Sequence, residues 1–280
     1  MSAAVALTIA GSDPSGGAGV QADLKTFAAH RVYGCAAITA LTAQNTRGVT
    51  AVHPVPAAVV AGQLETLLTD VTVHATKIGM LPDADVVRAV VSVLRSRPAG
   101  PVVLDPVMVA TSGDRLAGPD VVTALRDELL PLVDLVTPNV PEAGVLLGER
   151  PAEDLAAVIR QAQTLYGRCG VPVLLKGGHL DADHHGGGPG ESADVLVDTA
   201  GVRIVARDRI DTPATHGTGC TLSSALAALA SRRPPGPVPW APLVEEARSY
   251  LQEALRRGAG LGIGHGHGPV GHQVYVAAPD

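Results

Sequence analysis

Residues 5–30 have the sequence VALTIAGSDPSGGAGVQADLKTFAAH, in which an apolar run, a glycine-rich loop and a helical pattern follow one another. The apolar run Val5–Ala10 predicts a first β-strand, and the residues Val20–His30 predict a helix. The stretch therefore predicts a strand, a loop and a helix in that order, the building unit of an α/β fold.

The same alternation continues along the rest of the chain. Further strands are expected at Cys35–Leu41, His74–Ile78, Val102–Leu104, Leu132–Val136 and Pro172–Leu175, and a hairpin is expected from Ala193–Val197 and Val202–Val205. Further helices are expected at Ala57–Thr69, Asp83–Arg97, Pro119–Leu130, Val140–Leu147, Glu153–Gly167, Cys220–Ser231 and Pro242–Arg257. The predicted fold class is α/β, with a central, mainly parallel sheet between two layers of helices. Ligands of such sheets bind at the edge formed by the carboxyl ends of the strands.

Two biased segments were considered as domain boundaries. Residues 181–192 (DADHHGGGPGES) are expected to form a disordered surface loop, and residues 232–239 (RRPPGPVP) a proline-stiffened connector. Neither divides the chain, so a single domain over residues 1–280 is predicted.

Composition excludes several classes of protein. The chain is 46% hydrophobic but only 2% aromatic, and a core of small aliphatic residues suits buried parallel strands. With a net charge of −6, no basic field attracts nucleic acid or an anionic membrane, and no apolar run reaches the roughly 18 residues that a membrane helix needs. Three cysteines without a CxxC pair indicate a reduced, cytoplasmic protein.

The strongest local motif is HGTGC at residues 216–220, directly before a predicted helix. Its glycines allow a tight turn in which backbone N–H groups converge, and the helix that follows adds the positive end of its dipole. Gly217, Thr218 and Gly219 are therefore candidates for an anion hole. The alternative interpretation is an ordinary glycine turn with a threonine cap.

A second glycine-rich loop, GSDPSGGAG at residues 11–19, follows the first strand. It lacks the GxGxxG spacing of a dinucleotide fingerprint, and no GxxxxGK[ST] motif occurs in the chain. In this loop Asp13 is a candidate acceptor for a substrate hydroxyl or amine. A plain Asp-Pro turn is the competing interpretation.

Polar residues at two other strand ends are candidate ligands for Mg²⁺ and phosphate. Asn139 and Glu142 open a predicted helix, where their spacing also fits a capping box, and Asp105 follows another strand. Of the three lysines, Lys176 ends a buried strand at the expected ligand edge and is a candidate phosphate contact. Lys77 has a similar position.

Seven stretches, taken in order along the chain, resemble the hydroxymethylpyrimidine/phosphomethylpyrimidine kinases over nearly its whole length. They are LTIAGSDPSGGAGVQADLKTF, AITALTAQNT, KIGML, VLDPVMVATSGDRL, LVTPNVPEA, LLKGGH and HGTGCTLSSALA. The resemblance implies a ribokinase-like three-layer fold, ATP and Mg²⁺ as cofactors, and a homodimer. It also implies two phosphoryl transfers in thiamine biosynthesis, first to 4-amino-5-hydroxymethyl-2-methylpyrimidine and then to its monophosphate.

The resemblance also assigns roles by position. The residues implied to bind the pyrimidine are Gly11, Asp13, Gln44 and Met80. Those implied to bind phosphate and Mg²⁺ are Asn139, Glu142, Lys176 and Asp105, and those implied to form the catalytic anion hole are Gly217, Thr218, Gly219 and Cys220.

Cys220 occupies a position where many related sugar and pyridoxal kinases have aspartate. A helix N-terminus lowers the pKa of a thiol. Our hypothesis is that a Cys220 thiolate deprotonates the hydroxymethyl group in the first transfer, whereas the second acceptor, already an ionised phosphate, needs little base.

Three alternatives stay open. A pyridoxal kinase of the same superfamily shares the hydroxymethyl group on a nitrogen ring, although Gln44, Met80 and Cys220 favour the pyrimidine. A nucleotide-binding oxidoreductase would need a dinucleotide fingerprint, and none is found. A non-catalytic binding protein on the same fold is the third, and the presence of Lys176, Glu142 and Cys220 speaks against it.

Overall fold

The computed structural model describes residues 3–108, 118–178 and 190–274. Its centre is an eight-stranded sheet in the order β10-β9-β8-β7-β6-β5-β1-β2. Neighbouring strands from β2 to β8 pair in parallel, whereas β9 runs antiparallel to β8 and to β10. The strands are β1 (Val5–Ala10), β2 (Tyr33–Ile38), β5 (Ala75–Ile78), β6 (Val102–Leu104), β7 (Leu135–Val136), β8 (Val173–Lys176), β9 (Glu191–Asp198) and β10 (Gly201–Asp208).

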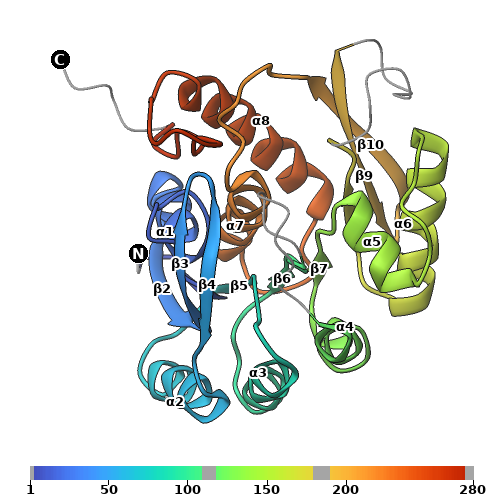
Figure 1. The fold of residues 1–280 in the computed structure, drawn as a ribbon. Helices are drawn as coiled ribbons and strands as arrows, with labels where there is room; N and C mark the ends of the chain where they lie inside the picture. The colour runs from blue at the N-terminus through green and yellow to red at the C-terminus, as the bar shows by residue number, and fades with distance from the viewer. Residues whose placement is uncertain (1–2, 109–117, 179–189, 275–280) are drawn as a thin grey trace.

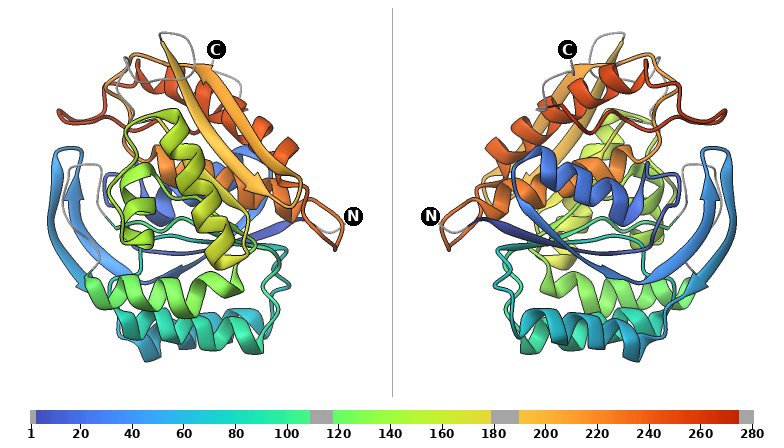
Figure 2. Two further views of the ribbon diagram at one scale, coloured as in Figure 1. Left: turned by 90° about the vertical axis from the view of Figure 1, so that its right-hand side faces the viewer. Right: turned by 90° about the vertical axis from the view of Figure 1, so that its left-hand side faces the viewer.

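Helices cover both faces of this sheet, which confirms the predicted three-layer α/β/α fold (Figures 1 and 2). The first helical layer consists of α1 (Gly19–Ala29), α7 (Thr218–Ser231) and α8 (Trp240–Gly258). The second consists of α2 (Ala57–Leu68), α3 (Ala84–Ser96), α4 (Pro119–Ala124), α5 (Val140–Leu147) and α6 (Leu155–Cys169). A π turn, η1 (Leu125–Leu129), and a 3-10 turn, η2 (Leu130–Leu132), continue α4.

The buried strands divide their side chains between two hydrophobic cores. Val173 and Leu175 of β8 pack into the core that contains α2 to α6, whereas Leu174 packs into the core that contains α1, α7 and α8. Because successive side chains of a strand point to opposite faces, an uninterrupted apolar run such as 173–175 serves both layers.

The prediction of a single strand over Cys35–Leu41 is wrong, because the structure divides this region between two sheets. β2 ends at Ile38, and a new strand, β3 (Ala40–Asn45), pairs with β4 (Gly48–Pro54) in a separate antiparallel hairpin (Figure 1). Thr39 marks the division: its N–H donates to the Ala10 carbonyl at 3.0 Å and its hydroxyl donates to the Met80 carbonyl at 2.7 Å. These bonds direct the chain out of the main sheet.

The other expected elements are confirmed with small changes of length. The predicted strand Leu132–Val136 shortens to β7, because Leu130–Leu132 forms η2 and the Asp134 carboxylate accepts the Val102 N–H at 2.8 Å. The predicted hairpin is formed by β9 and β10 around Asp198 and Gly201. Most of the glycine-rich segment 181–192 lies outside the described residues.

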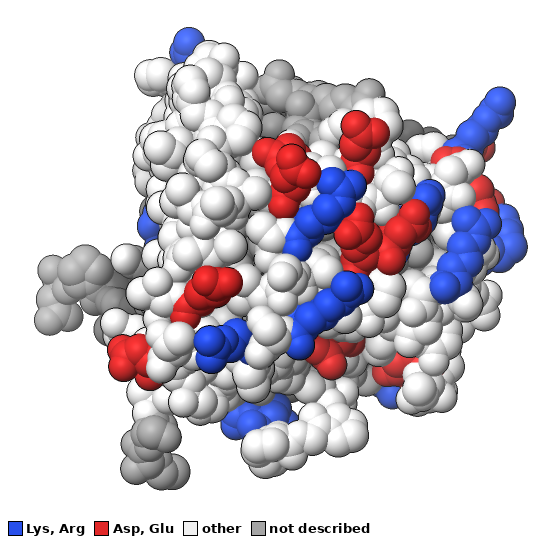
Figure 3. All heavy atoms as spheres, turned by 90° about the horizontal axis from the view of Figure 1, so that it is seen from below, with Lys and Arg blue, Asp and Glu red and all other residues white. Residues whose placement is uncertain are grey.

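Charge on the face formed around α2 to α4 is mixed in sign. Seen from below, basic and acidic side chains alternate over this face (Figure 3). Exposed ion pairs contribute to the mixture, for example Arg88 with Asp85 and Glu128. Within the described ranges, no helix combines the length and apolar character needed to cross a membrane.

Candidate active site

The carboxyl ends of the parallel strands open into a cavity of about 630 Å³. All twelve residues singled out from the sequence line it. They are Gly11, Asp13, Gln44, Met80, Asp105, Asn139, Glu142, Lys176, Gly217, Thr218, Gly219 and Cys220. The sheet therefore brings together loops that are up to about 200 residues apart in the chain, at the edge where an α/β sheet binds ligands.

The anion hole predicted at residues 217–219 is the amino end of α7. Gly217 is the N-cap residue and has φ = 81°, a left-handed conformation that favours glycine. A Cβ atom at this position would lie 1.8 Å from the carbonyl oxygen of Gly17, so only glycine allows the two glycine-rich loops to touch. The first amides of α7, together with the helix dipole, face the cavity as a site for negative charge.

The buried side chain of Asp13 links the two glycine-rich loops, residues 11–19 and 216–220. Its carboxylate accepts hydrogen bonds from the N–H groups of Ser15, Gly17 and Ala18, and it lies 2.8 Å from Nε2 of His216. Burial opposes ionisation of Asp13, but hydrogen bonds from His216 and Ser15 hold its pKa below the ordinary value. Its two oxygens are thus engaged inside the protein, while a contact with the substrate stays a prediction.

The sequence did not indicate a role for His216, but its side chain contacts Asp13 and so links the 216–220 motif to the glycine-rich loop 11–19. Its ring is buried between the loops, and its backbone pairs with the C-terminal segment through the Gly268 carbonyl at 3.0 Å. The junction fixes the position of the 216–220 motif relative to the first strand. A histidine directly before GTG is the only sequence signal that could have indicated it.

Three charged residues form the polar centre of the cavity. Nζ of Lys176, at the end of β8, lies 2.7 Å from the buried carboxylate of Asp105. Glu142 lies beside both, and burial, reinforced by the negative charge of Asp105, raises its pKa to about 7, although Lys176 opposes the increase. Two carboxylates in one buried site therefore leave an excess of negative charge that a cation would relieve.

The capping-box interpretation of Asn139 and Glu142 is confirmed. The Asn139 side chain accepts the Glu142 N–H at 2.8 Å, and Oε2 of Glu142 accepts the Asn139 N–H at 2.8 Å. This pair begins α5 and at the same time holds the Glu142 carboxylate beside Asp105. The structural and the functional interpretations of the motif are therefore compatible.

The donor atoms around Asp105 and Glu142 fit a hard divalent cation in part. Carboxylate oxygens are what Mg²⁺ prefers, and Mg²⁺ is usually held by only one or two carboxylates together with waters and phosphate oxygens. Among the described residues, no group of three or more His, Cys, Asp or Glu side chains is placed to hold a metal ion. The pair thus suits a metal brought in with a nucleotide rather than a closed protein site.

Cys220 lies where the amino ends of two helices meet. It is the third residue of α7, and the N–H of Gly19, the first residue of α1, donates to its sulfur. Burial is the dominant influence on the thiol and raises its pKa to about 11. Only a small fraction of the thiol is therefore ionised at neutral pH, which limits the base that our hypothesis assigned to it.

The three residues implied to contact the ring of the substrate, Gly11, Gln44 and Met80, also line the cavity. A Cβ atom on Gly11 would lie 2.6 Å from Cε of Met80, so the absence of a side chain at Gly11 makes room for the methionine. Gln44, on β3, accepts the Thr42 hydroxyl at 3.1 Å through Oε1. The hairpin that was not predicted as such is therefore the element that carries Gln44 to the cavity.

Sequence reasoning missed two buried ion pairs, of which Lys77, Arg248 and Asp194 line the cavity. Lys77 binds Asp23 at 2.9 Å, and Arg248 of α8 binds Asp194 of β9 at 3.1 Å. Arg248, Asp194 and Leu251 of α8 all line the cavity. Charged residues inside apolar helical patterns were the available signal, because such residues are rarely buried without a partner.

The histidine-rich segment near the C-terminus, with histidines at 265, 267 and 272, is packed in part. His272 is buried, and its Nε2 lies 3.2 Å from the Thr221 hydroxyl, whereas His265 and His267 are exposed. Burial lowers the pKa of His272 to about 4. The three side chains therefore do not share one environment.

Comparison with known proteins gives a consistent result. The model of the phosphomethylpyrimidine kinase family matches residues 13–271. The hydroxymethylpyrimidine/phosphomethylpyrimidine kinase of Escherichia coli is 50% identical over 268 residues, covering 95% of this chain and 96% of the relative. The thiamine biosynthesis multifunctional protein ThiED of Corynebacterium efficiens is 52% identical over 95% of this chain, which spans 34% of that longer protein.

Among solved structures, a pyridoxal kinase of Bacillus subtilis in an ADP complex has a similar fold. Its TM-score is 0.84 at 32% sequence identity, and 98% of each chain is covered. This likeness confirms the ribokinase-like α/β fold implied by the sequence motifs.

Proposed function

The chain belongs to the phosphomethylpyrimidine kinase family, and from its site we propose that it uses ATP to phosphorylate 4-amino-5-hydroxymethyl-2-methylpyrimidine and then the resulting monophosphate. The diphosphate formed in this way enters thiamine biosynthesis. One observation carries the proposal: twelve residues from separate motifs converge on one cavity, which is lined both by Gly11, Gln44 and Met80 and by the charged residues Asp105, Glu142 and Lys176.

In the first transfer, the hydroxymethyl oxygen attacks the γ-phosphorus of ATP, the bond to the β–γ bridging oxygen breaks, and ADP leaves. Lys176 lies beside the start of α7, since a Cβ atom on Gly219 would be 3.2 Å from its Nζ. Its ammonium and the first amides of this helix would therefore both stabilise charge on the reacting phosphoryl group. Phosphoryl transfer depends mainly on position and on stabilisation of negative charge. Both are supplied by groups that the fold holds in place.

Asp105 and Glu142 would hold Mg²⁺, with Asn139 fixing the Glu142 carboxylate. When bound, the ion neutralises charge on the phosphate oxygens. Without a cation, Lys176 alone offsets the two carboxylates, and its ion pair with Asp105 keeps it at the edge of the phosphate site.

Gln44 and Met80 would select the acceptor. The Gln44 amide can donate and accept at once, which suits the ring nitrogen and exocyclic amine of an aminopyrimidine. Met80 supplies apolar contact for the ring. Gly11 and Asp13 shape the loop on the same side of the cavity.

Cys220 would receive the hydroxyl proton in the first transfer, as a minor thiolate form. The second acceptor is an ionised phosphate oxygen, which attacks the γ-phosphorus of another ATP without giving up a proton. The same site therefore supports both transfers, with Cys220 needed chiefly in the first.

We extend the proposal to the state of the protein in the cell. One continuous sheet supports the proposal of a single kinase domain. Every site residue except Gln44 lies on a strand of this sheet or on a loop or helix that follows one. A cytoplasmic location is supported by three free cysteines. A homodimer is supported by the exposed apolar side chains of Tyr33 on the edge strand β2 and Leu41 on β3. Neither nucleic acid nor a membrane is proposed as a partner, in keeping with the net charge of −6.

A coupled assay of ADP release tests the acceptor. With ATP and Mg²⁺, both the hydroxymethylpyrimidine and its monophosphate should be turned over. Pyridoxal should give a kcat/KM at least about fivefold lower, because a missing hydrogen bond to Gln44 costs on the order of 1 kcal/mol or more. Chelation of divalent metal should abolish all turnover. Strong turnover of pyridoxal alone would instead identify a vitamin B6 kinase, the activity of the Bacillus subtilis structure.

A further inference from the structure

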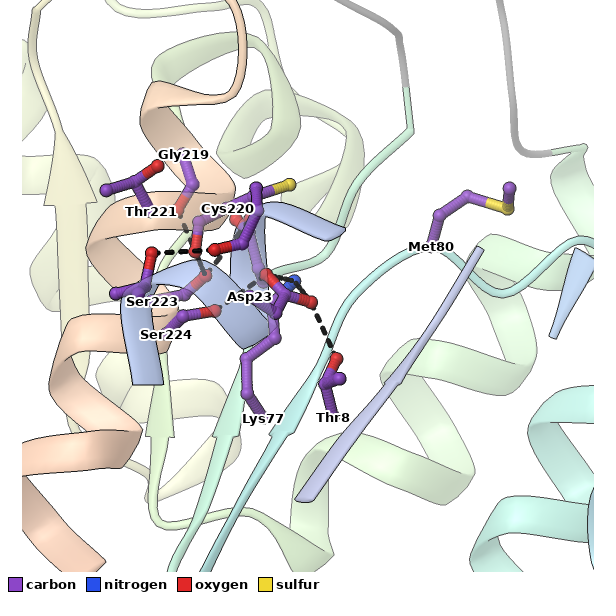
Figure 4. Close-up of polar contacts among 12 residues, drawn as sticks. Thr8, Asp23, Lys77, Met80, Gly219, Cys220, Thr221, Ser223 and Ser224 are labelled. Carbon is purple, nitrogen blue, oxygen red and sulfur yellow. Dashed lines mark hydrogen bonds and ion pairs between the residues drawn. The ribbon is translucent and has the colours of Figure 1, made fainter. Parts of the chain in front are cut away.

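Beneath the catalytic loop lies a buried ion pair that the proposed function has not used. Nζ of Lys77, on β5, lies 3.0 and 2.9 Å from the two carboxylate oxygens of Asp23 on α1, and both side chains are fully buried. The hydroxyls of Thr8 and Ser224 each donate to Asp23 at 2.6 Å (Figure 4). The carboxylate is thus saturated by three elements of the fold: β1, β5 and α7.

This arrangement costs more than a plain packing solution would. A buried ion pair is often no more stabilising than apolar side chains of similar volume. Stability alone therefore does not explain why this core contains one. Ser224 follows Cys220 by one turn of α7, which places the pair directly below the start of that helix (Figure 4). Lys77 also lines the cavity together with Cys220.

The orientation of the pair matters for the thiol. Lys77 is the strongest charged influence on Cys220 and favours its thiolate, and Asp23 acts in the opposite direction but more weakly. Lys77 is therefore the member of the pair that acts more strongly on the cysteine. In turn, Asp23 and then Cys220 are the leading anionic influences on Lys77, and they keep its pKa above the ordinary value despite burial.

The other groups that face the thiol come from neighbouring strands and helices. Asp105, after β6, disfavours the thiolate, whereas the Gly19 amide at the start of α1 favours it. Lys176, at the end of β8, also interacts electrostatically with Cys220. Of these, Lys176 is committed to Asp105 at 2.7 Å. Lys77, in contrast, is held in position by Asp23, which is not one of the residues expected to bind the nucleotide.

We propose that Lys77 is a positioning residue of the catalytic site, held by Asp23 so that its ammonium stabilises the Cys220 thiolate against the effect of burial. The proposal deepens the role given to Cys220 above and rests on that proposed function for its importance in catalysis. The charge relation itself stands on the buried geometry and can be measured without any kinase reaction.

The test uses the rate at which Cys220 reacts with iodoacetamide, since only the thiolate reacts. Cys35 and Cys169 are first replaced by alanine, so that Cys220 is the sole thiol. In this background the double variant Asp23→Asn/Lys77→Met removes the pair without leaving a buried charge. We expect alkylation roughly tenfold slower between pH 7 and 9, because each unit of thiol pKa changes the thiolate fraction about tenfold.

A matched control separates charge from packing. Thr8→Val removes a hydrogen bond to the same carboxylate but no charge, and its alkylation rate should stay within about twofold of the parent. Should the double variant fail to give a native near-UV circular dichroism spectrum, Asp23→Asn/Lys77→Gln supplies a neutral hydrogen-bonding pair for the same measurement. A folded double variant that reacts as fast as the parent, or faster, would overturn the proposal.

The outcome is independent of the kinase assignment. Alkylation is measured without ATP or pyrimidine, so slow alkylation of the double variant supports the proposal even if neither pyrimidine is turned over. Conversely, normal pyrimidine turnover with unchanged alkylation would retain the function and remove Lys77 from the site.

Discussion

Replacing Lys176 by methionine is expected to lower kcat/KM for both phosphorylations by about 10³-fold, the upper range for loss of one group that stabilises a transition state. The ammonium lies between Asp105, at 2.7 Å, and the amino end of α7. Because both acceptors receive the same γ-phosphoryl group, the loss should be equal in the two steps. Initial rates of ADP release with each pyrimidine measure it.

A matched substitution controls for loss of a cation in general. Arg88→Met removes an exposed basic residue of α3 and should leave both rates within about twofold of the parent. Melting temperatures should be recorded, since Lys176→Met leaves the buried Asp105 carboxylate without its partner. A folded Lys176→Met protein with more than a tenth of the parent activity would contradict the role given to this lysine.

Cys220→Ala should affect the two steps unequally. We expect about a 10²-fold loss of kcat/KM for the hydroxymethylpyrimidine, at the low end for loss of a general base, and less than about fivefold for its monophosphate. Burial raises the thiol pKa to about 11, so the thiolate fraction increases as pH rises from 7 towards that value. The first step in the parent should therefore accelerate with pH, and the Cys220→Ala enzyme should lose that dependence.

The measurement is a pair of pH profiles between pH 7 and 9, one for each acceptor, with parent and variant. Cys220→Ser serves as a second variant that keeps a small polar group without a titratable thiol. Equal losses in both steps would show that the side chain supports the loop rather than proton transfer.

The sequence predicted the strand and helix order well, because several buried strands are apolar runs and several helices begin at a capping residue, as α3, α5 and α6 do at Asp83, Asn139 and Asp154. The run around Leu174 is an example, since its neighbours serve both cores. The hairpin β3–β4 was missed because residues 35–41 are apolar except for Thr39. The division at Thr39 depends on hydrogen bonds to Ala10 and Met80, which are distant in the chain.

The sequence identified the cavity residues that lie in glycine-rich turns or at the ends of strands, such as Asp13, Asp105 and Lys176. Lys77 was noted as a strand-end lysine, but its pairing with Asp23 was missed, because Asp23 lies in a helical pattern without a motif and only the fold brings the two residues together. The raised pKa of Cys220 could not be predicted for a similar reason. The helix N-terminus was visible in the sequence, but the burial that outweighs it was not.

The central claim is that one cavity carries out both transfers. Incubating the protein with Mg²⁺, excess ATP and only the hydroxymethylpyrimidine, and following products by mass spectrometry, tests it most directly. We predict that the monophosphate forms first and is then converted to the diphosphate. A reaction that stops at the monophosphate, or an inert pyrimidine beside phosphorylated pyridoxal, would contradict the account.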